Sequence, residues 1–352
     1  MNSRERIKKV LQHQETDRIP IHDSPWGATV SRWRKEGLPD DISPEEYFGY
    51  EIVGFGADIT PRYPVKTLEK NEEFIIETTP FGGIRKNFRD YTTTPEIIDY
   101  KIKSKKDWEE VKERLYPDFT RVDWASGLTN NYREYENGKF IVYTSGVGYD
   151  LFQSYIRTEQ LLIWMIEDPD WIREMFMTSA QLTIEMAKMM IEKGFRFDGA
   201  WLFDDMGYRN TSLFSPQTYC NISLPVHKML CDFFHSKGLP VILHSCGNVK
   251  VLIPHLIEAG FDCLQPLEVK AGMDLIELKK EFGDKLSFMG GIDVRLMSDP
   301  DQNKIENEIK TKINFAKKHG GYIYHSDHSV PNNVSFQQYK RVIELVKKYG
   351  QY

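Results

Sequence analysis

The stretch ILHSCGNV, residues 242–249, sets a histidine and a cysteine two positions apart, where an apolar run ends and a glycine turn begins. In an extended segment residues i and i+2 point to the same side, so His244 and Cys246 can both reach one ion. Imidazole and thiolate suit Zn²⁺, and a third protein ligand would leave the fourth position open for chemistry. The alternative interpretation is a buried small cysteine before a turn, beside a core histidine.

Polar side chains also follow the other apolar runs of the chain. They are His22, Asp23 and Trp26; Thr144, Ser145, Tyr149 and Asp150; Asp204, Asp205 and Arg209; Gln265 and Glu268; Asp293 and Arg295; and His325, Asp327 and His328. A packed core avoids such groups, whereas an active site needs them. From this set we expect substrate contacts by His22, Trp26, Tyr149, Arg209 and His325.

The pair Asp204-Asp205 is a candidate for catalysis. A carboxylate here could act as a general base, hold a metal, or orient His244. Adjacent residues of a strand point to opposite faces, so at most one of the two faces the site unless the strand has already ended. The alternative is that Asp205 opens a loop and only bonds to the backbone.

These residues need a framework that gathers strand ends. Five βα units follow one another over residues 198–350, each with a nearly continuous apolar strand that is typical of a parallel sheet. Residues 17–26, 51–60 and 139–150 supply three more candidate strands. Eight strands predict an α/β fold of the (β/α)8 TIM-barrel type, in which the active site lies at the carboxyl ends of the strands. An open, doubly wound sheet is the alternative.

Two further segments complete the predicted fold. Residues 73–91 alternate around Pro80 and two glycines, which predicts a β-hairpin inserted outside the barrel in the N-terminal half. Residues 104–115 predict a surface helix with Trp108 and Leu115 on its inner side. Because no linker, repeat or low-complexity tract interrupts residues 1–352, we expect a single domain.

Composition excludes several classes of function. The net charge is -6, and no Lys/Arg block is dense enough to follow a phosphate backbone, so no nucleic acid is expected. No window approaches the roughly 18 consecutive apolar residues of a membrane span, and the N-terminus lacks the apolar core of a signal peptide. Four cysteines in 352 residues do not form a disulfide scaffold, which favours the cytoplasm. Motifs for nucleotide binding (GxGxxG, GxxxxGK[ST]), the GxSxG elbow and HExxH are absent.

The segment 241–293, with its H-x-C-G turn, its LQPLE strand and its GGID turn, resembles the uroporphyrinogen decarboxylase superfamily. The resemblance runs from ERIKKVLQHQETDRIP near the start to the end of the chain, and it implies a (β/α)8 barrel. One branch comprises metal-free decarboxylases with an arginine-rich segment after the first strand, where this chain has IHDSPWGAT. The other comprises zinc-dependent methyltransferases that exchange methyl groups with a corrinoid protein.

Resemblance to the second branch implies His244 and Cys246 as two zinc ligands. Its coenzyme M-using members have a cysteine as third ligand, and alignment of IYHSDHSVP places Asp327 there, with His325 and His328 beside it. We take Asp327 and His328 as further metal ligands. A carboxylate or imidazole in place of a thiolate makes a harder site, which suits an ether oxygen better than a thiol.

The resulting hypothesis is a zinc-dependent methyltransferase, an O-demethylase that moves a methyl group from a methoxylated aromatic compound to the Co(I) of a corrinoid protein. Zn²⁺ is its expected cofactor, the corrinoid protein and a small-molecule methyl donor are its expected partners, and a homodimer is considered. The alternatives are methyl transfer from the corrinoid protein to a thiol or folate, a metal-free decarboxylase, and a non-catalytic ligand-binding barrel.

Overall fold

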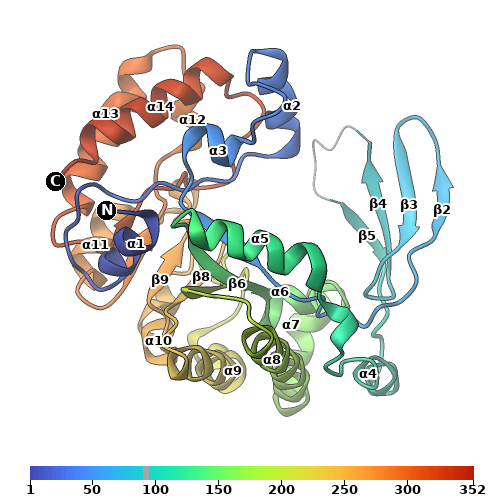
Figure 1. The fold of residues 1–352 in the computed structure, drawn as a ribbon. Helices are drawn as coiled ribbons and strands as arrows, with labels where there is room; N and C mark the ends of the chain where they lie inside the picture. The colour runs from blue at the N-terminus through green and yellow to red at the C-terminus, as the bar shows by residue number, and fades with distance from the viewer. Residues whose placement is uncertain (90–94) are drawn as a thin grey trace.

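The protein, as a computed structural model that describes residues 1–89 and 95–352, is built around a sheet of seven parallel strands (Figure 1). The strand order is β1-β6-β7-β8-β9-β10-β11, so each strand pairs with the one that precedes it in this series. The strands are β1 (Ile52–Phe55), β6 (Phe140–Gly146), β7 (Gly199–Phe203), β8 (Val241–His244), β9 (Cys263–Gln265), β10 (Ser287–Met289) and β11 (Tyr322–Ile323). The predicted α/β barrel architecture is confirmed by this parallel series.

The eighth strand position is occupied by residues 20–22, which join the two edges of the sheet. The Tyr324 N–H donates to Pro20 O at 2.9 Å, and the Glu51 N–H donates to Ile21 O at 3.0 Å. We predicted a strand over residues 17–26, but only Ile21 forms a bridge toward β11. The ladder stops there because Pro20 has no N–H and the Ile21 N–H donates to the Glu51 carboxylate at 2.6 Å.

Helices cover the outside of the sheet, and those of the five predicted βα units are present. They are α9 (Pro216–Ser236), α10 (Ile253–Ala259), α11 (Leu275–Phe282), α13 (Gln302–Ala316) and α14 (Phe336–Tyr349). The remaining helices are α1 (Ser3–Leu11), α2 (Gly27–Lys35), α3 (Pro44–Phe48), α4 (Lys105–Lys112), α5 (Trp124–Glu136), α6 (Gly148–Phe152), α7 (Thr158–Glu167), α8 (Pro169–Glu192) and α12 (Val294–Met297), with 3-10 turns at Phe119–Arg121, Lys250–Leu252 and Val269–Ala271. Ser215 caps α9 by accepting the Thr218 N–H, as its Ser-Pro start predicts.

A second, antiparallel sheet stands beside the barrel (Figure 1). The predicted hairpin corresponds to β3 (Phe74–Thr78) and β4 (Ile84–Phe88), which pair along their whole length; residues 90 and 91 of the predicted segment lie outside the described residues. Two strands that we did not predict flank it, β2 (Thr67–Lys70) and β5 (Glu96–Asp99). All four residues of β2 are exposed, so it lacks the alternation of apolar and polar residues that marks a half-buried strand.

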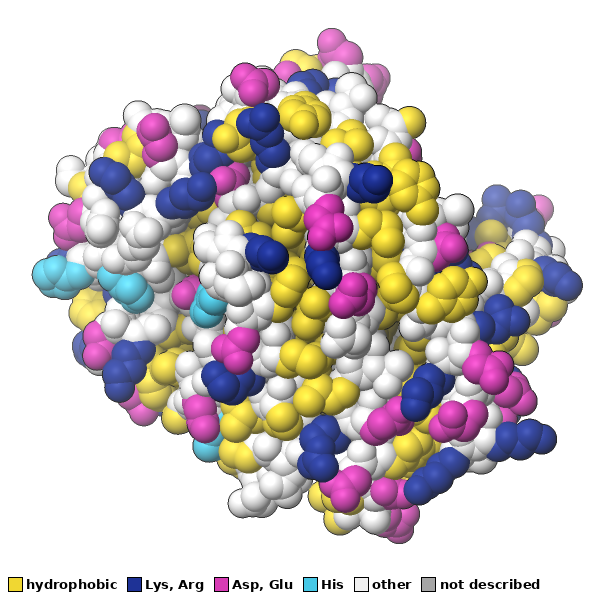
Figure 2. Space-filling model, turned by 60° about the horizontal axis from the view of Figure 1, so that its bottom comes forward, with side chains coloured by type: hydrophobic (Ala, Val, Ile, Leu, Met, Phe, Trp, Pro, Cys, Tyr) yellow, Lys and Arg dark blue, Asp and Glu magenta, His cyan; other side chains and the backbone are white. Residues whose placement is uncertain are grey.

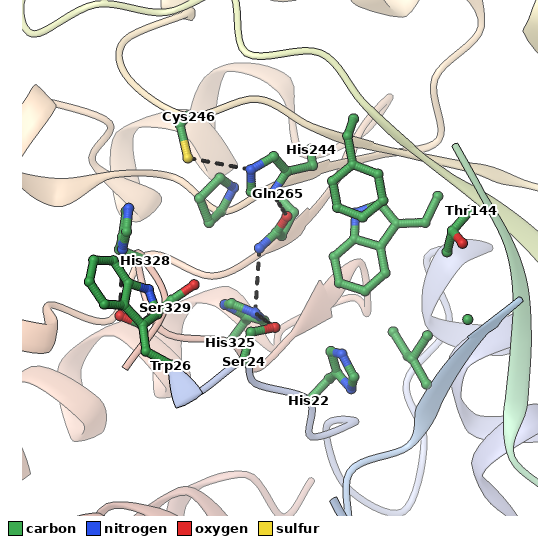
Figure 3. A pocket seen from close by; sticks show the side chains of 15 residues that line it. His22, Ser24, Trp26, Thr144, His244, Cys246, Gln265, His325, His328 and Ser329 are labelled. Carbon is green, nitrogen blue, oxygen red and sulfur yellow. Dashed lines mark hydrogen bonds between the residues drawn. The ribbon is translucent and has the colours of Figure 1, made fainter. Parts of the chain in front are cut away.

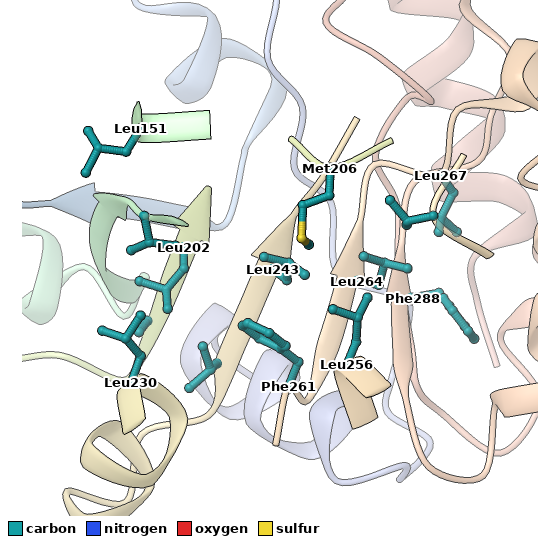
Figure 4. Close-up of a cluster of buried hydrophobic side chains, with 14 of the residues drawn as sticks. Leu151, Leu202, Met206, Leu230, Leu243, Leu256, Phe261, Leu264, Leu267 and Phe288 are labelled. Atoms are coloured by element: carbon teal, nitrogen blue, oxygen red, sulfur yellow. The ribbon is translucent and has the colours of Figure 1, made fainter. Parts of the chain in front are cut away.

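Two hydrophobic clusters alternate along the strands. Val142, Trp201 and Ile242 point into the barrel. Helix α1 closes the end of the barrel at which the strands begin. The neighbouring residues on the same strands, such as Leu202 and Leu243, point outward against the helices (Figure 4). This strict alternation means that continuing each strand by two residues places the next side chain on the barrel axis.

The outer surface mixes charges of both signs. On the face that Figure 2 shows, basic and acidic side chains are interspersed with hydrophobic ones. A mixture of this kind produces no extended field of one sign. None of the helices that the structure describes has both the length and the apolarity needed to cross a membrane.

Candidate functional site

The carboxyl ends of the strands carry a layer of polar side chains above the apolar barrel interior. His244 follows Ile242 on the inner face of β8, and Gln265 follows Cys263 on the inner face of β9. Phe203 follows Trp201 in the same way on β7. Because the strands are parallel, these positions all reach one end of the barrel, which is where (β/α)8 enzymes place their chemistry.

Five potential metal ligands gather at this end of the barrel. Ligand atoms of Asp205, His244 and Cys246 lie within 4.8 Å of one another, and so do those of Cys246, Glu268 and His328. The His244 Nε2 atom is 3.4 Å from Cys246 Sγ and 3.4 Å from Asp205 Oδ1. Because Cys246 belongs to both groups, its sulfur could share an ion with His244 and Asp205 or with Glu268 and His328.

A chain of hydrogen bonds fixes which nitrogen of His244 is free to bind a metal. Ser326 O accepts a hydrogen bond from His325 Nδ1 at 2.7 Å, so the neutral His325 ring has its acceptor at Nε2. Gln265 Nε2 donates to that atom at 3.4 Å, and Gln265 Oε1 accepts from His244 Nδ1 (Figure 3). The lone pair of His244 Nε2 therefore points toward Cys246, in the tautomer that a metal ligand requires.

The electrostatics of the group fit a cation. Burial, together with the carboxylates of Asp205 and Glu268, raises the pKa of the Cys246 thiol. Glu268 is buried, and the ammonium group that approaches it belongs to the largely exposed Lys270, at 3.7 Å. A half-buried thiol and two carboxylates with so little positive charge nearby are stabilised by a bound cation, and an imidazole, a thiolate and a carboxylate are ligands that zinc accepts. The donor set therefore fits Zn²⁺.

The two aspartates after β7 have different surroundings, because consecutive residues point to opposite faces. Asp204 is fully buried on the helix side, where its oxygens accept hydrogen bonds from His227 Nε2 at 2.9 Å and from the Asp150 N–H at 2.8 Å. Asp205 points toward the site, and its Oδ1 accepts the Cys246 N–H at 2.7 Å. Of the two predicted catalytic carboxylates, only Asp205 reaches the metal-ligand cluster; Asp204 positions α6 and α9.

Asp327 is not among the residues that the structure gathers there. Its Oδ1 accepts the Val294 N–H at 2.9 Å and its Oδ2 accepts the Val269 N–H at 3.0 Å. The carboxylate thus ties together the loops after β9 and β10, and burial raises its pKa to about 6. Glu268 lies in the cluster instead of Asp327. From the sequence we identified Glu268 only as a residue at a strand end and did not assign it to the metal.

The cavity beside the cluster has a volume of about 470 Å³ (Figure 3). Three predicted substrate contacts, His22, Trp26 and His325, line it. Trp201 and Phe203, which we did not predict as site residues, form part of the wall. The sequence could have indicated them, because side chains alternate along β7 and residues 201 and 203 therefore share the face that points into the barrel.

Two other predicted substrate contacts do not line the cavity. Tyr149 is fully buried against Phe214, with ring centroids 5.3 Å apart, so it belongs to the packing around α6. Arg209 lies in the exposed loop after β7. Arg209 is not among the residues that line the cavity, and its neighbour Tyr208 pairs with Asn248.

Replacing Gln265 by methionine is expected to weaken zinc binding by about 10- to 100-fold, because the side chain of similar length no longer orients His244. Competition with a chelating dye measures the affinity, and the absorption bands of the cobalt-substituted protein should persist, since the ligands are unchanged. Gln181→Met, on an exposed face of α8, is the matched control. Unchanged affinity in Gln265→Met would mean that the amide does not orient the imidazole.

Comparison with known proteins agrees with this architecture. The family model described as uroporphyrinogen decarboxylase (URO-D) matches residues 83–349. A methylated-thiol–coenzyme M methyltransferase of Methanosarcina mazei is 24% identical over 139 residues, which is 39% of this chain and 34% of the relative. A methylcobamide:CoM methyltransferase of Methanosarcina barkeri is 28% identical over 142 residues, 40% of this chain and 39% of the relative.

A uroporphyrinogen decarboxylase of Vesicomyosocius okutanii is 22% identical over 189 residues, 53% of this chain and 51% of the relative. The chain thus matches about a third to a half of the length of these relatives. The solved structure of a methyltransferase from Methanosarcina mazei superposes with a TM-score of 0.68 at 16% identity and covers 99% of both chains. That likeness shows a shared fold, and the family model covers well over half of the sequence. The chain belongs to the uroporphyrinogen decarboxylase (URO-D) family.

Proposed function

We propose that this protein is a corrinoid-dependent methyltransferase that binds Zn²⁺ through His244, Cys246 and a carboxylate. The observation that carries the proposal is the cluster of imidazole, thiol and carboxylates at the mouth of an aromatic cavity. We assign Glu268 as the third ligand, because it is buried beside Cys246, whereas Asp205 is engaged by the Cys246 N–H. The names of the methyltransferase relatives support the same class of reaction.

Within this class we propose a methoxylated, aromatic compound as methyl donor. When bound, zinc supplies a Lewis acid that stabilises the charge developing on the leaving oxygen. The bond from the methyl carbon to that oxygen breaks, the oxygen keeps its electron pair, and Co(I) of the corrinoid supplies the pair for the new bond. Asp205, whose Oδ1 accepts the Cys246 N–H at 2.7 Å, would position the Cys246 ligand or pass a proton to the leaving oxygen.

Methyl transfer to or from a thiol is the second candidate, and the names of two relatives favour it. Fewer thiolates around zinc make a harder site, which suits oxygen better than sulfur. The decarboxylase alternative has less support, because none of the residues that line the cavity is an arginine or lysine that could bind the carboxylates of a porphyrinogen.

Two absorption assays on the zinc-loaded full chain distinguish these candidates. In the first, 2-methoxyphenol and cob(I)alamin should give methylcobalamin, which is followed by the loss of the Co(I) spectrum. In the second, methylcobalamin is offered with 2-mercaptoethanol. Methyl transfer only in the second assay would assign the thiol reaction, and no transfer in either assay would contradict a methyltransferase. Cys246→Ala should abolish whichever transfer occurs.

A further inference from the structure

The wall of the cavity carries no formally charged side chain of the lysine, arginine, aspartate or glutamate type. Its polar members are histidines, Ser24, Thr144, Gln265, Ser329 and the thiol of Cys246. An anionic group that entered this space would lose its hydration without gaining a counterion, which costs several kcal/mol. The cavity therefore favours an uncharged ligand over an anionic one.

The two histidines on the side of the cavity away from Cys246 do not supply positive charge. Burial lowers the pKa of His22 well below its usual value, so its ring is neutral near pH 7. His325 donates through Nδ1 to Ser326 O and accepts at Nε2 from Gln265, which is the hydrogen-bonding pattern of a neutral ring. In Figure 3 both lie across the cavity from Cys246.

The shape of the wall favours a flat ligand. A series of rings runs from His22 through Trp201 and Phe203 to His244, with successive centroids 5.5, 5.5 and 5.2 Å apart. The planes of Trp201 and Phe203 differ by 18°, so they present nearly parallel faces. Trp26, whose ring centroid is 6.2 Å from that of His328, lines another part of the cavity. Aromatic ligands gain from offset stacking or edge contacts with such rings.

Two polar atoms of residues that line the cavity have no hydrogen-bond partner among the residues that the structure describes. The His22 side chain is only 9% exposed, and its buried Nδ1 atom makes no hydrogen bond. Trp201 Nε1, from the neighbouring ring, is also buried without a partner. Buried polar groups are normally hydrogen-bonded, so unpartnered rings on residues that line a cavity leave a hydrogen bond available to a polar group of a ligand.

We infer that the cavity selects an uncharged, flat ligand, whose reacting atom lies at the His244–Cys246 end and whose far end carries a hydroxyl-type group bonded by His22. This inference rests on the proposed methyl transfer, because that reaction decides which end of the ligand lies beside His244 and Cys246. It assigns neutral methoxylated phenols as donors and excludes substrates whose far end is a carboxylate or sulfonate. Coenzyme M, which carries a sulfonate, falls in the excluded class.

The test is equilibrium binding to the zinc-loaded full chain without any corrinoid, read by calorimetry. Two pairs of probes differ mainly in the charge of the group at the far end: 4-methoxyphenol against 4-methoxybenzoate, and 2-mercaptoethanol against 2-mercaptoethanesulfonate. In each pair the neutral member should bind at least about 10-fold more tightly, the factor that corresponds to about 1.4 kcal/mol. Equal or tighter binding of the anionic members would overturn the inference.

Variants test the cause of the selectivity. Thr144→Lys, which adds a cation to the wall, should reverse the order in both pairs, whereas Thr129→Lys on the exposed face of α5 should leave it unchanged. His22→Phe should weaken 4-methoxyphenol, whose hydroxyl lies opposite the methoxy group, by about 3- to 10-fold, the worth of one hydrogen bond, and leave methoxybenzene unaffected. Equal weakening of both ligands would overturn the role of His22.

Because no corrinoid is present, failure of this inference differs from failure of the proposed function. Selective binding of neutral probes by a protein that transfers no methyl group would retain the charge selection and remove the methyltransferase. Methyl transfer from an anionic donor would do the reverse.

Discussion

Zinc content is expected to fall from about one ion per chain to less than about a tenth of that in Cys246→Ala and in His244→Ala, since each variant loses one of the protein ligands that zinc requires. Methyl transfer should fall by more than about 100-fold, because even residues that merely orient zinc ligands account for factors of 10 to 100. Mass spectrometry of metals on protein purified without chelators measures the first quantity, and the cobalamin assays measure the second.

Cys220→Ala is the matched control for this loss. Cys220 is also partly exposed and also lies beside a histidine, with its Sγ 3.4 Å from His255 Nδ1, but it is outside the two groups of potential ligands. The control should keep its zinc. Wild-type protein that stays free of metal when zinc is offered would refute the metal site and leave the ligand-binding barrel as the interpretation.

The third ligand can be assigned by two further variants. Glu268→Gln should lose most of the zinc, because an amide is a poor ligand in place of a carboxylate. Asp327→Asn should keep its zinc and instead lose stability, because its carboxylate holds two backbone N–H groups of neighbouring loops. The opposite result would restore Asp327 as the ligand.

Glu51→Gln is expected to destabilise the fold by about 3 kcal/mol, near the lower end of the range for breaking a buried ion pair. Glu51 is 1% exposed and pairs with Arg6, 5% exposed, and with Arg18 at 3.0 Å. The loss stays near the lower end because Arg6 keeps a second partner, Asp17, at 2.8 Å. Urea unfolding measures the free energy, with an unchanged slope expected for an unchanged fold.

The same variant should loosen the segment that closes the barrel. Glu51 accepts the Ile21 N–H, so hydrogen exchange at Ile21 should quicken more than exchange in the central strands. Glu344→Gln, which removes an exposed partner of Arg341 at 4.0 Å, is the control and should cost less than about 0.5 kcal/mol. An equal effect of the two substitutions would show that the buried pair does not hold the barrel closed.

Much of this protein follows from local features of its sequence. Apolar runs that alternate with amphipathic segments over residues 198–350 predicted the parallel sheet, because burial on both faces requires such runs. The two-residue spacing of His244 and Cys246 predicted that both point to one side, since the side-chain period of a strand is two. Both features depend only on neighbours in the chain.

Only the tertiary structure decided which of the strand-end residues meet. Asp204 and Asp205 look equivalent in sequence, but the register of β7 turns one toward His227 and the other toward Cys246. Asp327 and Glu268 both follow strands, yet their positions differ. The Asp327 carboxylate accepts two backbone N–H groups, whereas Glu268 lies beside Cys246. The eighth strand position depends on Glu51 binding the Ile21 N–H across 30 residues. Such contacts join residues far apart in the chain, so they are set by packing and hydrogen bonding in three dimensions, which no local pattern records.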